Sequence, residues 1–194
     1  MKTKKITSHL NNDNKGFSLI ELIVTMAIMV VFVAVAIISS SVIDTSRVQE
    51  VERGIDDFVG LARSKSMSVS AKHWYMELTT KDGVYVTKLY KVEEVEVSEG
   101  VYEDKVIEVD REEYNDKVSV TFSFKDGVDE KTYTIDENSP LCIYFSSTTG
   151  KVSDIQVDGS SVNISSGIGH IKIAAQSDDA TLKFFYNTGK IERE

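Results

Sequence analysis

An apolar run of 22 residues near the N-terminus, residues 17–38, constrains this chain more than any other feature. Only Ser18, Glu21 and Thr25 interrupt it. At a rise of about 1.5 Å per residue, a helix of this length spans about 33 Å, which is enough to cross the hydrocarbon core of a bilayer. The run therefore predicts a membrane-spanning helix.

The carboxylate of Glu21 lies inside this run, where an ionised group is energetically unfavourable. An ionised carboxylate costs about 2.5 to 3.5 kcal/mol at the centre of a membrane helix, and less near an end. No Lys, Arg or His stands between Phe17 and Arg47. Cleavage after Gly16 would create a cation, because the new α-amine of Phe17 has an ordinary pKa of about 7.7 to 8.0 and would lie about one helical turn away.

The sequence Gly16-Phe17-Ser18-Leu19-Ile20-Glu21, followed by an unbroken apolar helix, resembles the class III signal of type IV pilins and type II secretion pseudopilins. The resemblance implies that a membrane-embedded prepilin peptidase cuts after Gly16 and N-methylates Phe17. It also implies that the amine of an incoming subunit pairs with Glu21 of a neighbour while the helices pack into a filament core. The implied partners are the peptidase, other pilin or pseudopilin subunits, an assembly platform protein and the inner or cytoplasmic membrane.

Two other interpretations of the N-terminus stay open. An ordinary secretory signal also places lysines before an apolar stretch, and Ala34-Val35-Ala36 would offer a signal peptidase site. Glu21 would then lie inside the apolar stretch, which is longer than the usual length of about 7 to 15 residues. A plain signal anchor explains the length but not the glycine, phenylalanine and glutamate together. In both cases the chain would be an extracytoplasmic ligand-binding or sensor module, and the helix would serve at most as a tether.

Charge divides the chain into a basic leader and an acidic remainder. Residues 1–16 carry four lysines and one aspartate, a net charge of +3, which predicts a cytoplasmic N-terminus. The whole chain carries −9, so the part after the leader carries −12, which argues against a nucleic-acid partner. We predict a leader at 1–16, a membrane or filament-core helix at 17–38, an amphipathic continuation at 39–70 and an extracytoplasmic β domain at 71–194. The protein is then a single-pass membrane protein that enters a surface or periplasmic filament on assembly.

The helical period continues beyond the apolar run. Apolar residues recur at spacings of three and four, at Val48, Val51, Ile55, Phe58, Val59 and Ala62. This pattern predicts one helix from about Phe17 to about Ser70, with Gly54 as a candidate soft point.

After His73 apolar residues recur at every second position, in segments rich in Val, Ile, Tyr, Phe and Thr. Both features predict β-strands. The expected strands are 75–78, 84–92, 106–109, 118–124, 132–135, 141–145, 171–174 and 182–185. Asp-Gly steps at 82–83, 126–127 and 158–159 suit the positive φ angles of tight hairpins. We therefore expect an α+β, pilin-like fold in which an antiparallel meander packs on the second half of the helix, with Trp74 and Tyr75 between helix and sheet.

Two segments, 144–151 and 184–190, share an aromatic strand, a Thr-Gly turn and a following lysine. Each predicts a strand that returns after the turn. Together with Leu61-Ala62-Arg63-Ser64-Lys65-Ser66, they are similar to the minor pilins and pseudopilins of the GspH and FimT type.

The sequence offers no pattern for catalysis, and we predict that the protein is not an enzyme. His9, His73 and His170 are scattered, and no HExxH, GxSxG, P-loop or CxxC pattern occurs. Cys142 is the only cysteine, so no intrachain disulfide can form. Its apolar neighbours predict a small core residue rather than a nucleophile.

Carboxylates are abundant without forming a motif. Residues 93–96 fit a strand, and we expect 99–104, 110–113 and 178–179 in loops. Some pseudopilins hold calcium in such loops, so a calcium site is an open alternative to solvated acidic loops. No EF-hand pattern is present, and we expect no cofactor.

Overall fold

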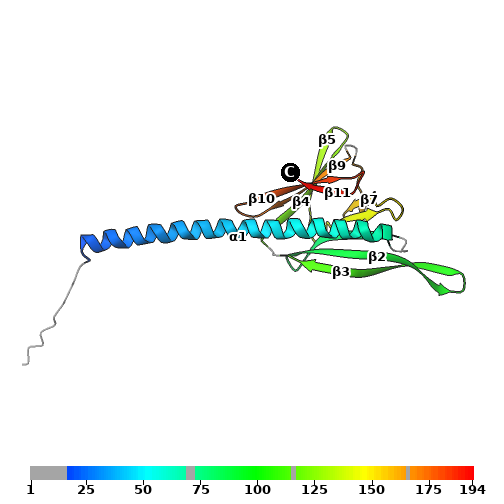
Figure 1. Cartoon of the computed structure of the whole chain (residues 1–194), viewed down its shortest axis with the longest axis horizontal. Coiled ribbons are helices and arrows are strands. Elements are labelled where there is room, and N and C mark those ends of the chain that lie inside the picture. Colours follow the sequence, from blue (N-terminus) through cyan, green and yellow to red (C-terminus); the bar gives the residue numbers. More distant parts are fainter. Residues whose placement is uncertain (1–16, 69–72, 115–116, 165–166) are drawn as a thin grey trace, which may run out of the picture. The chain divides into compact units, whose positions relative to one another are not determined.

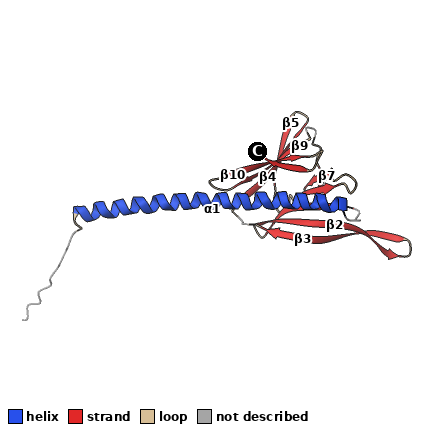
Figure 2. Cartoon of the chain, viewed as in Figure 1, coloured by secondary structure: helices blue, strands red, loops and turns tan. Residues whose placement is uncertain are grey.

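The computed structural model describes residues 17–68, 73–114, 117–164 and 167–194. Within these ranges one helix precedes eleven strands (Figures 1 and 2). The chain divides into two compact units, Met1–Ser39 and Ser40–Glu194. The predicted α+β fold, a long N-terminal helix packed on antiparallel sheets, is confirmed.

The helix α1 spans Leu19–Ser68, close to the predicted limits. Within the second unit it buries one apolar stripe, whose members are at most 6% exposed: Val48, Val51, Ile55, Phe58, Val59 and Ala62. Glu50, Arg53 and Asp57 lie on its exposed side. The spacing of three and four therefore decides which face of this half packs, as expected for an amphipathic helix.

The strands form two antiparallel sheets rather than the single meander predicted. The first sheet has the order β3-β2-β1-β6-β7-β8 and the second has the order β11-β10-β9-β4-β5. The strands of the first sheet are β1 (His73–Lys81), β2 (Val84–Ser98), β3 (Val101–Glu113), β6 (Leu141–Phe145), β7 (Val152–Val157) and β8 (Ser160–Ser161). Those of the second are β4 (Ser119–Asp126), β5 (Asp129–Thr134), β9 (Ile168–Ala174), β10 (Asp179–Phe185) and β11 (Lys190–Arg193).

The prediction of a meander is wrong because two ladders join strands that are distant in sequence. β1 pairs with β6 from Trp74↔Phe145 to Leu78↔Leu141, and β4 pairs with β9. Alternating apolar residues fix which face of a strand is buried but not which strand lies beside it. The strands that return after the two Thr-Gly turns, β7 and β11, are confirmed.

One hydrophobic core joins the apolar stripe of α1 to side chains from both sheets. It includes Met76 and Phe145 from the first sheet and Phe122 and Phe184 from the second, all fully buried. Trp74 lies in this core as predicted.

Two residues expected in the interior instead lie on the opposite face of the first sheet. The ring of Tyr75 stacks between those of Tyr90 and Tyr144, with ring-centroid distances of 4.9 and 4.6 Å. Cys142 lies half-buried on the same face of β6 as Tyr144. Burial raises the pKa of its thiol to about 12, so the residue is a neutral thiol at physiological pH.

Most of the acidic segments placed in loops belong to strands. Residues 101–104 and 110–113 lie on β3, and only Glu99 and Gly100 form the turn between β2 and β3. Glutamate and aspartate have low β propensity, which hid these strands in the sequence. Cross-strand pairs such as Val92↔Val106 and Glu93↔Lys105 support the ladder.

Gly54 is a packing position of α1 and not a soft point. A Cβ atom at Gly54 would overlap the phenol ring of Tyr114, which is 3% exposed. The backbone N–H of Tyr114 donates to the carbonyl of Tyr85 at 2.7 Å, which holds the end of β3 beside β2. The absent side chain of Gly54 therefore lets a buried tyrosine reach the helix backbone.

Replacing Gly54 tests this close approach. Alanine in a helix interior is normally about 1 kcal/mol more favourable than glycine. In Gly54→Ala the overlap with Tyr114 should reverse the sign, because overpacking a core costs about 1 to 3 kcal/mol. We expect a lower free energy of unfolding, measured by urea denaturation of the full chain in detergent micelles.

Gly60→Ala is the matched control, because Gly60 is exposed on the same helix and a Cβ there meets no atom within 4 Å. It should be neutral or stabilising by up to about 1 kcal/mol. Equal effects of the two substitutions would contradict the packing role of Gly54.

Candidate functional site

The start of α1 carries the predicted signal residues, of which Gly16 lies outside the described part of the chain. Ser18 caps the helix: the N–H of Glu21 donates to its Oγ at 3.3 Å, and the N–H of Leu22 donates to its carbonyl at 3.2 Å. Ser18 and Glu21 have the Ser-x-x-Glu spacing of a capping box. This cap was not predicted, although its Ser-x-x-Glu spacing is visible in the sequence.

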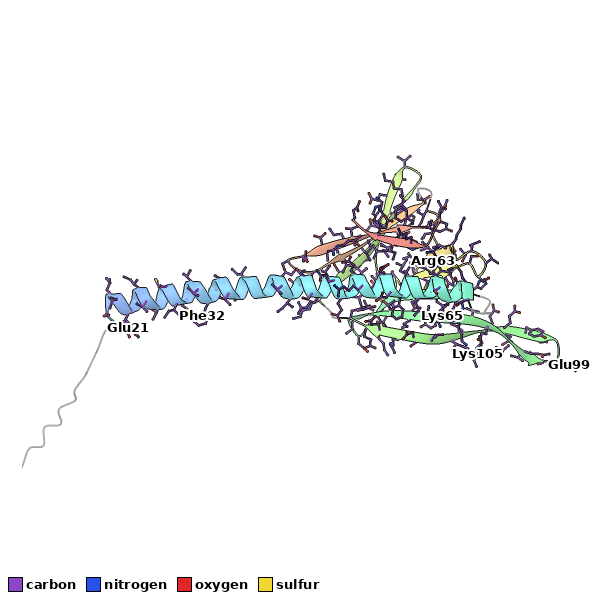
Figure 3. The ribbon with its side chains drawn as sticks, viewed as in Figure 1. Glu21, Phe32, Arg63, Lys65, Glu99 and Lys105 are labelled. Carbon is purple, nitrogen blue, oxygen red and sulfur yellow. The ribbon has the colours of Figure 1, made fainter. Side chains whose placement is uncertain are left out.

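Glu21 occupies the first turn of α1 (Figure 3). A carboxylate is favourable there because the helix dipole places partial positive charge at its N-terminus. The side chain is exposed and forms no ion pair within the described residues. Phe17, 80% exposed, immediately precedes the cap and lies four residues before Glu21. The carboxylate is therefore available to a cation outside the described chain.

The first half of α1 presents apolar side chains in every direction. All side chains from residue 17 to residue 37 are exposed, including Leu19 at 78% and Phe32 at 70%. By length and composition this helix could cross a membrane, and its most apolar stretch is not buried against any described part of the chain. A helix that is apolar all round needs lipid or other helices around it.

A buried carboxylate anchors α1 within the second unit. Asp44 is 4% exposed; its Oδ2 accepts a hydrogen bond from Ser177 Oγ at 2.7 Å, and its Oδ1 lies 3.0 Å from Arg47 Nη1. The hydrogen bond from Ser177 is the main cause that lowers the pKa of Asp44, and the hydrogen bond and positive charge of Arg47 lower it further. Together they outweigh the effect of burial, which raises the pKa. The sequence shows only the Asp-x-x-Arg spacing, because Ser177 lies 133 residues away.

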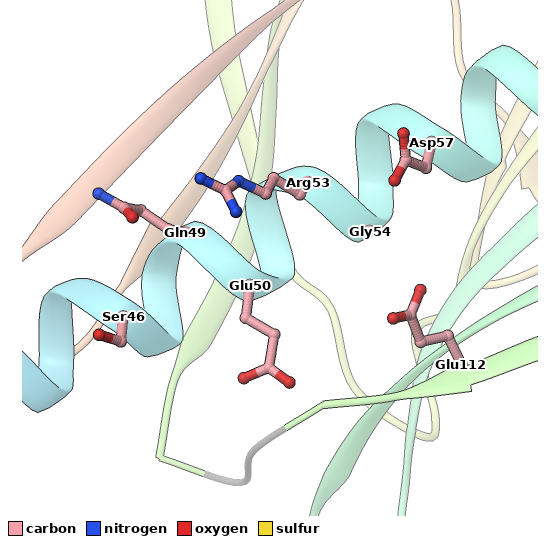
Figure 4. A pocket seen from close by; sticks show the side chains of 7 residues that line it. All are labelled: Ser46, Gln49, Glu50, Arg53, Gly54, Asp57 and Glu112. Carbon is pink, nitrogen blue, oxygen red and sulfur yellow. The ribbon is translucent and has the colours of Figure 1, made fainter.

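An open groove of about 440 Å³ lies between α1 and the end of β3 (Figure 4). Its lining consists of Ser46, Gln49, Glu50, Arg53, Gly54, Asp57 and Glu112. In the described ranges no three His, Cys, Asp or Glu side chains are placed to hold a metal ion. The acidic segments that suggested a calcium site lie largely on strands. The calcium alternative itself stays a prediction.

Comparison with known proteins identifies the N-terminal segment. Residues 11–37 match the family described as the prokaryotic N-terminal methylation motif. No curated protein and no solved structure matches the chain. The matched segment contains Gly16, Phe17 and Glu21 and supports a pilin-like protein processed by prepilin peptidase; the GspH and FimT subtype stays a prediction.

The lowered pKa of Asp44 predicts acid sensitivity. A carboxyl whose folded pKa lies below its unfolded value of about 3.9 stabilises the fold above that pH, and this contribution is lost as the pH falls through the folded pKa. Asp44→Asn should lower the free energy of unfolding at pH 7, and the deficit relative to wild type should shrink below about pH 4. Urea denaturation of the full chain in micelles across this range measures it.

Asp82→Asn is the control, because Asp82 is an exposed turn residue whose positive φ of 52° asparagine also tolerates. A deficit of Asp44→Asn that stays constant with pH would contradict the proposed role of the carboxylate.

Proposed function

We propose that the chain is a structural subunit, a minor pilin or pseudopilin, of a type IV pilus or a related type II secretion or competence filament. The observation that carries the proposal is Glu21, a carboxylate without an ion pair in the described chain, at the start of a helix that exposes apolar side chains on all sides. The methylation motif at residues 11–37 supports the same assignment.

Processing supplies the cation for Glu21. Cleavage after Gly16 leaves the α-amine of Phe17 immediately before the Ser18 cap. A positive charge there faces the positive end of the helix dipole, so it gains from a nearby carboxylate. N-methylation keeps the amine basic. The amine of an incoming subunit then pairs with Glu21 of a subunit already in the filament.

Hydrophobic burial provides the driving force for assembly. Outside the bilayer, packing these helices against each other removes apolar surface from water at about 25 cal/mol per Å². The ion pair mainly selects the axial register, because leaving one buried charge unpaired costs about 3 to 5 kcal/mol. A subunit in the wrong axial register is therefore destabilised by more free energy than the correct ion pair contributes.

A pilin-like subunit implies a topology and a set of partners. The basic leader stays in the cytoplasm, residues 17–38 cross the inner or cytoplasmic membrane, and the β domain lies outside. Prepilin peptidase, other pilin or pseudopilin subunits and an assembly platform protein are its partners. The protein is a substrate of the peptidase and performs no chemistry of its own.

Gly16→Ala tests the cleavage site. The added methyl group at the scissile position should hinder the peptidase, so the full-length precursor should accumulate in the membrane of the native host. Immunoblotting of membrane fractions measures the ratio of precursor to mature chain. Leu10→Ala, in the leader away from the scissile bond, is the control. Normal maturation of Gly16→Ala would overturn the assignment.

Glu21→Ala tests the ion pair. The variant should be processed normally but should enter filaments at least about tenfold less, because the incoming amine would be left unpaired in an apolar core at a cost of about 3 kcal/mol or more. Quantitative blotting of sheared or isolated filaments measures incorporation. Glu50→Ala removes an exposed carboxylate from the same helix and should have little effect. Undiminished incorporation of Glu21→Ala would remove the registration role.

A further inference from the structure

β2 and β3 continue past the first sheet as a two-stranded arm, residues 93–105. β1 pairs with β2 only as far as His73↔Val92, whereas the β2–β3 ladder continues from Glu93↔Lys105 to Ser98↔Val101. β3 is also an edge strand of its sheet. Among the residues that the structure describes, no third strand pairs with the arm on either side.

The arm exposes apolar side chains that contribute nothing to the core. Val95, Val97, Val101 and Tyr102 are 40%, 52%, 50% and 61% exposed. An isolated two-stranded hairpin is at best marginally stable in water, and clustered exposed apolar residues mark interaction surfaces. A partner that covers the arm would stabilise it.

The charge of the arm restricts that partner. Its 13 residues include six carboxylates and one lysine, a net charge of −5, so two arms would repel each other. The carboxylates are Glu93, Glu94, Glu96, Glu99, Glu103 and Asp104. The partner must be basic and partly apolar.

The same chain carries a surface of that kind at the C-terminal end of α1. Residues 58–76 contain no Asp or Glu. Arg63 and Lys65 lie in the last turns of the helix, and Lys151 follows Gly150, whose Cα packs against Met67. We name Arg63, Lys65, Met67 and Lys151 the basic end.

The cations of the basic end have no ion-pair partner among the described residues. The Nε atom of Arg63 is buried without a hydrogen-bond partner there. Met67 is 50% exposed. In Figure 3, Glu99 lies at the tip of the arm, away from Arg63 and Lys65 of the same chain.

We infer that the arm of one subunit docks on the basic end of a second copy of this chain. Carboxylates of the arm face the three cations, and the valines and Tyr102 cover Met67. The contact uses two different surfaces, so it repeats from copy to copy and yields an open chain rather than a closed dimer. This inference rests on the proposed filament function, in which copies of the chain lie close enough for their β domains to touch.

Cysteine cross-linking of the full-length protein in membranes of the native host tests the contact. Cys142→Ser removes the only cysteine, and Glu99→Cys and Ser64→Cys then mark the arm and the basic end. With a short bis-maleimide, the chain carrying both cysteines should give a ladder of dimers and higher species. Each single-cysteine chain should give none. A dimer from Glu99→Cys alone, or no ladder from the chain with both, would overturn the inference.

Charge exchange tests the electrostatics of the same contact. The arm variant, Glu96→Lys, Glu99→Lys, Glu103→Lys and Asp104→Lys, changes the arm from −5 to +3. The end variant, Lys65→Glu and Lys151→Glu, changes the basic end from +3 to −1. With Cys142→Ser and cysteines introduced by Val97→Cys and Ser64→Cys, either variant alone should reduce the ladder at least about fivefold. The two combined should restore it.

Far-ultraviolet circular dichroism and urea denaturation check that each variant is folded, and Asp129→Lys, on β5, is the control for a change of charge elsewhere. Loss without restoration in the combined variant would point to a different basic protein as the partner and would overturn docking between copies. If the ladder is absent while Phe17 is methylated and incorporation depends on Glu21, only this inference fails. If the leader remains attached, the proposed function fails.

Discussion

The structure depends on how one helix meets two different environments. Residues 17–37 of α1 expose apolar side chains all round, whereas the stripe from Val48 to Ala62 buries a single face against two sheets. The first half therefore needs lipid or neighbouring helices, and the second half needs only its own domain. Glu21, one turn inside the first half, is the group that this apolar environment tolerates least.

A cap and two side-chain contacts stabilise the helix and its packing, in a chain that can form no intrachain disulfide. Ser18 caps the start of the helix, and Asp44 ties the helix to Ser177 through a buried hydrogen bond. Gly54 admits the ring of Tyr114 and so brings the end of β3 against the helix. The acidic arm lies beyond these contacts, and its exposed valines are one basis for the docking that we propose between copies.

The sequence predicted features that depend on local order and missed those that depend on distant pairing. Helical spacing gave the limits and buried face of α1, and the signal residues were recognised because they are contiguous. The division into two sheets was missed because the β1–β6 ladder joins residues about seventy positions apart. Residues 93–96 were correctly expected in a strand, but the acidic residues of 101–104 concealed the other strand of the arm, since strand propensity does not register cross-strand pairing. The Asp44–Ser177 contact had no sequence signal.

Assembly through Glu21 requires that cleavage after Gly16 create a new amine at Phe17. The most direct test is to identify the N-terminal peptide of the mature protein. Mass spectrometry of the wild-type chain isolated from its native host should find Phe17 as the first residue, carrying one N-methyl group. A chain that retains its lysine-rich leader, or begins at another residue such as Ile37, would contradict the account.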